Sequence, residues 1–180
     1  MTITMNDFDY VREHVRQVPD FPKPGILFLD ITTATKDAKS MQKMIDFLVE
    51  QFKDEKVDYV AGIESRGFIF GAPLACKLNA GFVPVRKPNK LPAETVCEEY
   101  ELEYGTDKIE IHKDAVEAGK RVLIIDDLLA TGGTAKAACN LFKKVGADVV
   151  SVAFIIEICE LNGAKKIEET GVEVLSMLKF

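Results

Sequence analysis

Cysteine and histidine are scarce in this sequence, and their spacing does not suggest a metal site. The four cysteines lie far apart, with no C-x-x-C pair and no histidine at the spacing of metal ligands. We therefore expect neither a disulfide framework nor a zinc site. Free cysteines are typical of a reducing compartment, so the expected location is the cytoplasm.

Long apolar runs and a surplus of basic residues are also missing. No apolar stretch approaches the length of a membrane span, and the first fifteen residues lack the basic start and apolar run of a signal peptide. The net charge is −6 at pH 7. This charge argues against a protein that binds nucleic acid or a membrane surface, so neither partner is expected.

The negative charge is concentrated in one segment. Residues 91–107 contain six acidic residues and no lysine or arginine: Glu94, Glu98, Glu99, Glu101, Glu103 and Asp107. An acidic run of this kind is typical of an exposed loop.

Length and hydrophobic patterning predict one α/β domain covering residues 1–180. Short apolar runs alternate with amphipathic segments of helical period, which indicates β-α-β units, a parallel sheet and right-handed crossovers. The expected strands are residues 57–63, 82–85, 121–125, 149–156 and 172–177. The expected helices are residues 8–18, 41–52 with Asp37 as its N-cap, 70–78, 134–145 and 163–169. The fold class is therefore a central, mostly parallel sheet flanked by helices.

Ligands of such sheets bind outside the carboxyl ends of the strands. Three polar segments follow expected strands there, namely residues 64–67, 86–90 and 126–134. The third belongs to VLIIDDLLATGGT, in which an apolar strand runs into two carboxylates and a glycine-rich turn that opens a helix. Backbone N–H groups of such a turn bind phosphate, and the aspartates are suitable acceptors for a vicinal diol. Together they predict a site for a ribose 5-phosphate.

This segment has one structural alternative, and a rival phosphate-binding pattern occurs in part elsewhere in the chain. Asp126 and Asp127 could simply cap the following helix, although that leaves T-G-G-T unexplained. A nucleotide-triphosphate P-loop has the pattern G-x-x-x-x-G-K-[ST]. Residues 62–67 have its glycine spacing, but Phe68 stands where the lysine should be. The dinucleotide-binding pattern G-x-G-x-x-G does not occur.

The segment VLIIDDLLATGGT resembles the phosphoribosyl-pyrophosphate (PRPP) signature of the type I phosphoribosyltransferases. Four more segments, FPKPGILFLDIT, GIESRGFIFG, VRKPNKLP and EEYELEYG, are similar to those of the adenine-specific members of this family and occur in the same order. The resemblance implies transfer of phosphoribose from PRPP to adenine, giving AMP and pyrophosphate in purine salvage. It also implies a homodimer, and Mg²⁺ that travels mainly with the pyrophosphate, without a direct protein ligand.

The resemblance assigns roles to the polar segments at the sheet edge. Asp126 and Asp127 would hold the ribose hydroxyls, directly or through metal-bound water. Arg66 and Lys87 would bind the leaving pyrophosphate and are the expected catalytic cations, with Arg86 and Lys90 as further candidates. A cis peptide bond is expected between Glu64 and Ser65. The 5′-phosphate would lie on the turn formed by Ala130, Thr131, Gly132, Gly133 and Thr134.

Base recognition is assigned by the same resemblance to residues 1–35. Phe28 would stack on the purine, while the carbonyl of Leu27 and the N–H of Leu29 would read its edge. Leu29 departs from the family, where arginine is usual; a backbone contact would survive this change. An alternative is that residues 26–28 are ordinary core. No lysine lies in residues 26–31, which favours adenine over a 6-oxopurine, the nearest rival substrate.

The acidic segment corresponds to a mobile flap over residues 86–108. Glu103 would contact the purine and take part in proton transfer, which makes it the third expected catalytic residue. Tyr100 and Tyr104 would help to exclude water. The other glutamates, Glu94, Glu98, Glu99 and Glu101, are expected only to keep the segment soluble. A PRPP-sensing regulator is the rival from another class, but it would normally carry an additional basic domain.

Overall fold

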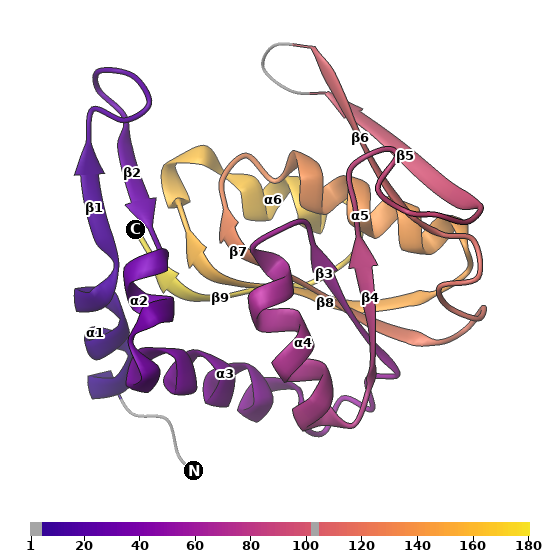
Figure 1. The fold of residues 1–180 in the computed structure, drawn as a ribbon, viewed down its shortest axis with the longest axis horizontal. Coiled ribbons are helices and arrows are strands. Elements are labelled where there is room, and N and C mark those ends of the chain that lie inside the picture. The colour runs from indigo at the N-terminus through magenta and orange to yellow at the C-terminus, as the bar shows by residue number, and fades with distance from the viewer. Residues whose placement is uncertain (1–4, 102–104) are drawn as a thin grey trace. The chain divides into compact units, whose positions relative to one another are not determined.

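The computed structural model describes residues 5–101 and 105–180, which fall into two compact units (Figure 1). The first unit spans residues 1–50 and the second residues 51–180. Within the described ranges, no helix combines the length and the apolar character that crossing a membrane requires.

The first unit consists of helices and a two-stranded antiparallel hairpin. Its elements are α1 (Met5–His14), β1 (Arg16–Pro19), β2 (Leu27–Asp30), α2 (Thr32–Lys36) and α3 (Ala38–Phe52), whose last residues belong to the second unit. The N-cap expected at Asp37 is confirmed, because its carboxylate accepts the Ser40 N–H at 2.7 Å directly before α3.

The first helix is shorter than its apolar spacing predicts. The pattern extends to Val18, but α1 ends at His14, and Val18 lies in β1 opposite Phe28. The Thr33 hydroxyl explains the break: it donates to the His14 carbonyl at 2.6 Å and accepts the Arg16 N–H at 3.1 Å. A side chain from α2 thus satisfies the polar groups at the helix end.

The second unit contains a five-stranded parallel sheet of order β4-β3-β7-β8-β9. Its strands are β3 (Tyr59–Ile63), β4 (Gly81–Val85), β7 (Arg121–Leu129), β8 (Asp148–Glu157) and β9 (Val174–Lys179). Its helices are α4 (Gly67–Leu78), α5 (Gly133–Lys144), the short 3₁₀ turn η1 (Cys159–Leu161) and α6 (Gly163–Glu168). The α/β class with a parallel sheet flanked by helices is therefore confirmed.

Helices cover both faces of this sheet. Figure 1 shows α4 in front of the strands and α5 and α6 behind them. On the α4 side, a Cβ at Gly71 would lie 2.8 Å from the Phe82 ring and 3.0 Å from Ile125, so α4 packs closely on β4 and β7. On the other side, Leu141 and Phe142 of α5 are fully buried against the sheet. The strands therefore read as nearly continuous apolar runs.

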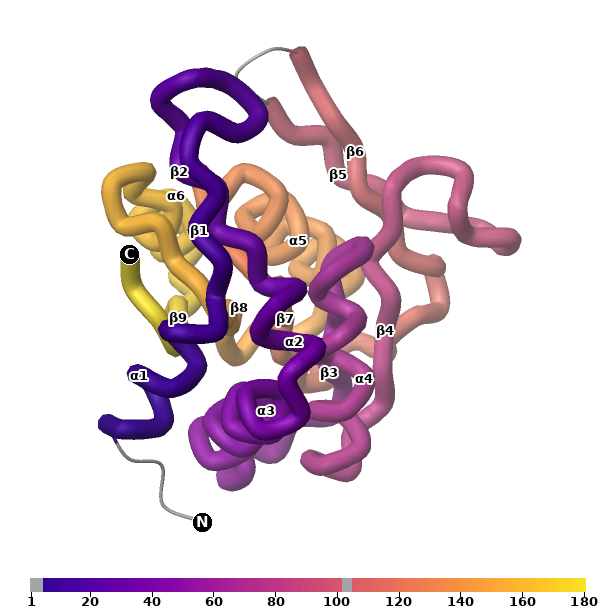
Figure 2. The backbone as a smooth tube through the Cα atoms, turned by 60° about the vertical axis from the view of Figure 1, so that its left-hand side comes forward, coloured from indigo at the N-terminus to yellow at the C-terminus, as the bar shows by residue number. Residues whose placement is uncertain are grey.

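The remaining strands form a separate hairpin that the sequence pattern does not predict. Strands β5 (Thr95–Glu101) and β6 (Thr106–His112) pair antiparallel, and Figure 2 shows them standing apart from the main sheet. One expectation for this segment is wrong: Glu98 is more than a solubilising residue. Its carboxylate pairs with Lys144 and accepts from Asn140 at 3.3 Å, which docks β5 on α5. The mobility of residues 86–108 stays a prediction.

Candidate active site

The carboxyl ends of β3 and β7 form the topological switch point of the sheet. From β3 the chain passes through α4 to β4, whereas from β7 it passes through α5, on the opposite face, to β8. Ligands of open parallel sheets bind at such a point. Two of the polar segments singled out from the sequence, residues 64–67 and 126–134, meet here.

Gly67, the first residue of α4, allows these two segments to touch. A Cβ at this position would lie 2.6 Å from the Ile125 carbonyl oxygen and 3.2 Å from Oδ1 of Asp126. Only glycine fits such an approach without moving β7. Directly before α4, the peptide bond between Glu64 and Ser65 is cis, as expected.

Arg66 and Asp127 form an ion pair between Nε and Oδ2 at this point. The Asp127 side chain is 4% exposed, whereas that of Arg66 is 51% exposed. A buried carboxylate therefore holds a guanidinium that still reaches solvent. The structure brings together a residue predicted to bind ribose and one predicted to bind pyrophosphate.

Asp126 directly precedes Asp127 in β7. Burial raises the pKa of its carboxyl well above the usual range, and the neighbouring Asp127 carboxylate raises it further. Its Oδ1 accepts the Asp127 N–H at 2.8 Å. Both aspartates belong to β7, and the N-cap of α5 is Gly132, so the alternative that they cap this helix is wrong.

An Asp126→Asn variant is expected to melt a few degrees higher than the wild type at neutral pH. A carboxyl whose pKa is higher in the folded state binds more protons there, so stability falls as the pH rises from the unfolded pKa through the folded one. The variant removes this fall and keeps the oxygen that accepts from Asp127. Thermal melting of both proteins from the unfolded to the folded pKa of Asp126 measures the higher melting temperature of the variant and the loss of the pH-dependent fall in stability. A lower melting temperature at neutral pH would show that the Asp126 anion stabilises the fold.

The turn predicted to bind phosphate follows β7 and opens α5. Residues 128–135, together with Asp126 and Phe154, line a cavity of about 100 Å³. Gly132 has φ of +76°, a left-handed conformation that favours glycine. The first N–H groups of α5 have no partner within the helix, and together with its positive end they suit an anion.

Gly163, the first residue of α6, packs against this turn. Nothing in the sequence pattern indicates this contact. A Cβ on Gly163 would lie 2.2 Å from the Ala130 carbonyl oxygen and 3.0 Å from the Gly132 nitrogen. Conversely, a Cβ on Gly132 would lie 2.5 Å from the Gly163 carbonyl oxygen. The start of α6 and the turn are therefore in direct backbone contact.

The segment after β4 is fixed by Glu64. This carboxylate accepts from Nε of Arg86 and from the backbone N–H of Lys87, both at 2.8 Å. The Arg86 hydrogen bond holds the pKa of Glu64 below its usual value. Lys90 is exposed. The loops after β3 and β4 are thus joined by a residue to which the sequence analysis gave no such role.

Lys87 extends from this segment to the hairpin. Its ammonium pairs with the Asp107 carboxylate and donates to the Tyr100 hydroxyl at 2.9 Å. Tyr100 also accepts from the Thr134 hydroxyl at 3.2 Å. Two residues predicted for opposite ends of PRPP, Lys87 and Thr134, therefore share a partner. Glu103 and Tyr104 lie outside the described residues.

The residues predicted to bind adenine lie in the first unit, on β2. Leu29 is buried, Leu27 is exposed, and Phe28 is half-buried with its ring edge-on to Phe21 at 5.2 Å between centroids. Because Ile26 is also exposed, the alternative that residues 26–28 are ordinary core fails.

The register of β1 and β2 bears on how this strand presents its backbone. Leu27 lies opposite Pro19 and Leu29 opposite Gln17. Proline has no N–H, so its nitrogen side faces away from the partner strand. Opposite residues of antiparallel strands alternate between hydrogen-bonded and non-hydrogen-bonded pairs. The pair of Leu27 with Pro19 is therefore not hydrogen-bonded, and neither is the pair of Leu29 with Gln17, so the N–H and carbonyl groups of both leucines point away from β1. This orientation suits the expected backbone contacts.

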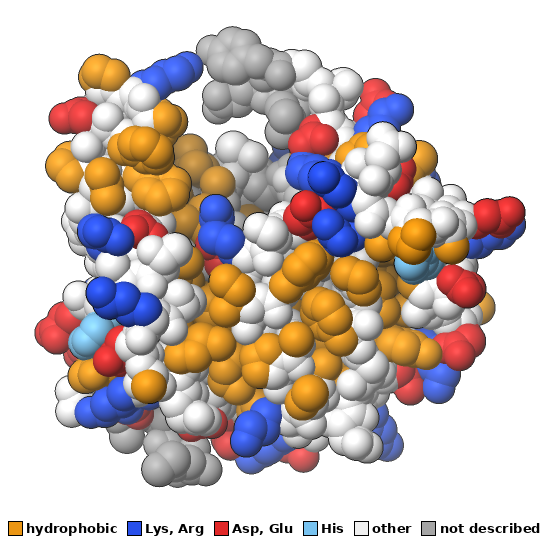
Figure 3. All heavy atoms as spheres, viewed as in Figure 1, with side chains coloured by type: hydrophobic (Ala, Val, Ile, Leu, Met, Phe, Trp, Pro, Cys, Tyr) orange, Lys and Arg blue, Asp and Glu red, His pale blue; other side chains and the backbone are white. Residues whose placement is uncertain are grey.

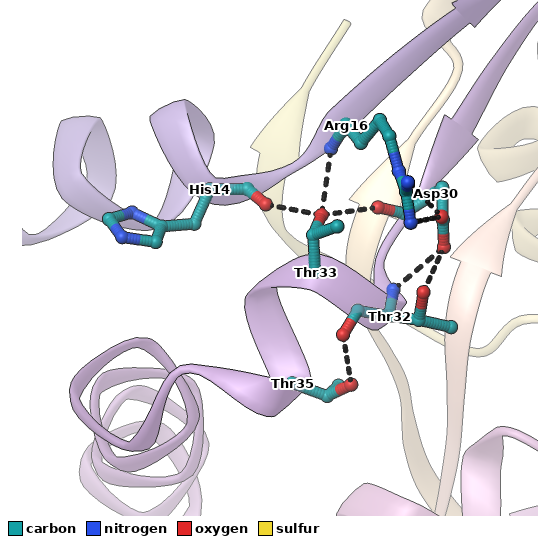
Figure 4. A network of polar contacts seen from close by, with 6 residues as sticks. All are labelled: His14, Arg16, Asp30, Thr32, Thr33 and Thr35. Carbon is teal, nitrogen blue, oxygen red and sulfur yellow. Dashed lines mark hydrogen bonds and ion pairs between the residues drawn. The ribbon is translucent and has the colours of Figure 1, made fainter.

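A polar network anchors β2 at its last residue, as Figure 4 shows. Oδ1 of Asp30 accepts the N–H and the hydroxyl of Thr32 at 2.9 and 2.6 Å, and the other carboxylate oxygen pairs with Arg16. The Thr32 hydrogen bonds hold the pKa of Asp30 below its usual value. Residues 27–29 are therefore held between a turn and a fixed strand end.

Comparison with known proteins agrees with this geometry. The phosphoribosyl transferase domain family matches residues 30–177. An adenine phosphoribosyltransferase from Cyanothece sp. is 60% identical over 161 residues, covering 89% of this chain and 95% of the relative.

Solved structures of similar proteins extend the match to the fold. The adenine phosphoribosyltransferase of Rhodothermus marinus superposes with a TM-score of 0.92 at 47% identity, covering 98% of this chain and 100% of that one. The enzyme from Saccharomyces cerevisiae, solved with an iminoaltritol bisphosphate and adenine, has a TM-score of 0.90 at 41% identity, covering 97% and 100%. The chain therefore belongs to the phosphoribosyl transferase domain family and, within it, to the adenine phosphoribosyltransferases.

Proposed function

We propose that this chain transfers the phosphoribosyl group of PRPP to adenine, forming AMP and pyrophosphate, and so serves purine salvage. The observation that carries the proposal is the switch point of the second unit. There, a phosphate-sized cavity, the Arg66–Asp127 ion pair and the loop bearing Lys87 follow the carboxyl ends of neighbouring strands. This combination suits a sugar with an anion at each end.

The PRPP-binding residues divide into two groups. The turn from Ala130 to Thr134 binds the 5′-phosphate through backbone N–H groups, and the aspartates Asp126 and Asp127 hold the ribose hydroxyls. Arg66 and Lys87 bind the pyrophosphate. The C1′–O bond breaks as N9 of adenine bonds to C1′, so negative charge grows on the departing group, and cations stabilise it there.

Adenine is bound by residues 27–29 in this proposal. Phe28 stacks on the purine, while the Leu27 carbonyl and the Leu29 N–H read the exocyclic amine and N1. Glu103 accepts or relays the proton that adenine loses at N9, and Tyr100 and Tyr104 exclude water that would hydrolyse the activated ribose.

Mg²⁺ is the proposed cofactor and enters with the pyrophosphate. The described residues contain no group of three or more histidine, cysteine or acidic side chains that could hold a metal. Mg²⁺ usually keeps several waters and takes its remaining ligands from phosphates and one or two carboxylates. Asp126 and Asp127 are suitable through water. When bound, the ion neutralises charge on the pyrophosphate.

A spectrophotometric assay with PRPP, Mg²⁺ and a panel of purines tests the function. We expect AMP from adenine and far slower reactions of 6-oxopurines. Failure of pure, folded protein to form AMP would reject the proposal, and preference for a 6-oxopurine would reject the assigned base. The four free cysteines suit a reducing cytoplasm, the proposed location.

We further propose a homodimer that uses the outer surface of α4 and β4. Figure 3 shows hydrophobic side chains gathered there, and Ile69 and Phe82 are 42% and 36% exposed. An exposed apolar patch of this kind is typical of a protein interface. The Ile69→Glu variant is expected to sediment as a monomer where the wild type sediments as a dimer. Met5→Glu, an equal change at an exposed methionine of α1, should leave the dimer intact; a dimeric Ile69→Glu variant would exclude this surface.

A further inference from the structure

We propose that Asp107 is a positioning residue that holds Lys87 ready for the pyrophosphate end of the substrate. This inference rests on the proposed function and adds a residue to which neither the motifs nor the resemblance gives a role. It begins from the register of the hairpin, in which Asp107 on β6 lies directly opposite Tyr100 on β5. Directly opposite residues of antiparallel strands interact on the same face.

Both side chains of this cross-strand pair contact the Lys87 ammonium. Asp107 pairs with it through Oδ2, and Tyr100 accepts from it at 2.9 Å. The Tyr100 hydroxyl lies 3.2 Å from the same Asp107 oxygen, so the three groups form a closed triangle of polar contacts. The Asp107 carboxylate is itself held, because its Oδ1 accepts the Lys108 N–H at 2.8 Å.

This triangle leaves the ammonium suited to an anion. A lysine has three N–H donors, and two of them are directed to Asp107 and Tyr100. The third donor can meet a phosphate oxygen without breaking either contact. Burial alone would lower the pKa of Lys87, but the hydrogen bonds to Asp107 and Tyr100 outweigh it and raise the pKa, so the group stays cationic. A flexible side chain is thereby fixed in position and charge before substrate arrives.

The same triangle connects the two ends of the proposed PRPP site. The Thr134 hydroxyl donates to Tyr100 at 3.2 Å, and Thr134 belongs to the phosphate turn. Asp107 therefore fixes Lys87 relative to the turn through one side chain of the hairpin. This link therefore sets the distance between the Lys87 ammonium, which would bind the pyrophosphate, and the turn that would bind the 5′-phosphate.

The test compares Asp107→Asn, Lys87→Ala and the double variant with the wild type. We expect Asp107→Asn to lower kcat/KM for PRPP by about threefold to tenfold, the cost of fixing one flexible side chain during binding. The KM for adenine and the melting temperature should stay at wild-type values, because the substitution preserves shape. In the Lys87→Ala background, Asp107→Asn should change kcat/KM by less than about twofold.

Glu99→Gln is the matched control. Glu99 forms a similar cross-strand ion pair with Lys108 at 2.8 Å on the same hairpin but does not touch Lys87. It should therefore retain wild-type kcat/KM for PRPP. If Asp107→Asn proves unstable, Tyr100→Phe tests the same triangle, since it keeps the ring and removes only the hydroxyl.

Three outcomes would overturn the positioning role. They are an unchanged or raised kcat/KM for PRPP in Asp107→Asn, an equal loss in Glu99→Gln, and a loss that persists undiminished in the Lys87→Ala background. Each leaves the proposed function standing, because that depends on AMP formation by the wild type. A wild type that forms no AMP rejects the function and, with it, this role.

Discussion

The Gly163→Ala variant is expected to lose about 10²-fold in kcat/KM for PRPP. Its Cβ would lie 2.2 Å from the Ala130 carbonyl oxygen, a separation that real atoms do not tolerate, so the turn and α6 must move apart. The turn provides the backbone N–H groups proposed for the 5′-phosphate, and a misplacement of about 1 Å costs an enzyme up to 10²-fold. Steady-state kinetics with PRPP and titration with AMP measure the loss.

Gly171→Ala separates this effect from the general cost of replacing a glycine. Gly171 has φ of +78°, and a Cβ there would meet nothing within 4 Å. The control should therefore lose about 1 kcal/mol of stability from backbone strain while retaining wild-type affinity for PRPP. Wild-type affinity in Gly163→Ala would instead show that the turn adapts and that it does not depend on α6 for its conformation.

The parts of the fold that the sequence predicts are those with a local cause. The strands of the main sheet are apolar runs bounded by polar residues, and the turn at Gly132 is marked by its own composition. Arg66 and Asp127 could be expected at one edge of the sheet, because Arg66 follows β3 and Asp127 lies near the end of β7, and the two strands are parallel. Their ion pair bears out that reasoning.

The hairpin of β5 and β6 is harder to predict, because long-range contacts, apolar as well as polar, hold it. Residues 95–101 read T-V-C-E-E-Y-E and lack a continuous apolar face. The hairpin is joined to the rest of the unit by Ile109 and Ile111 of β6, which are buried in the core. It is also joined by the polar contacts of Glu98 with Lys144 and of Tyr100 with Thr134. These polar pairs join β5 to α5 across more than thirty positions in the sequence, and only the tertiary fold brings them together.

Asp107 and Gly163 were missed for the same reason. In the sequence Asp107 is one acid among six, and only its position opposite Tyr100 makes it a partner of Lys87. Gly163 follows an unremarkable turn, and its role depends on how α6 meets the end of β7. Close backbone approach between distant segments leaves no local pattern to detect.

The Asp127→Ala variant is expected to bind PRPP about 10²-fold more weakly, with a smaller loss in kcat. Hydrogen bonds that the ribose hydroxyls donate to a carboxylate are worth about 3 kcal/mol together, which corresponds to roughly two orders of magnitude in affinity. The variant should still fold, because its partner Arg66 is half-exposed and can be solvated when the carboxylate is removed. Calorimetric titration with PRPP, or with AMP, measures the affinity directly.

Asp148→Ala is the control for this loss. Asp148 also pairs with an arginine, Arg121, at 3.1 Å, but it lies at the amino end of β8, away from the switch point. We expect wild-type affinity there, because removing an exposed ion pair changes stability by less than about 1 kcal/mol. An Asp127→Ala variant with unchanged affinity for both ligands would remove this residue from the ribose site, and the Arg66–Asp127 pair would then serve only to hold α4 against β7.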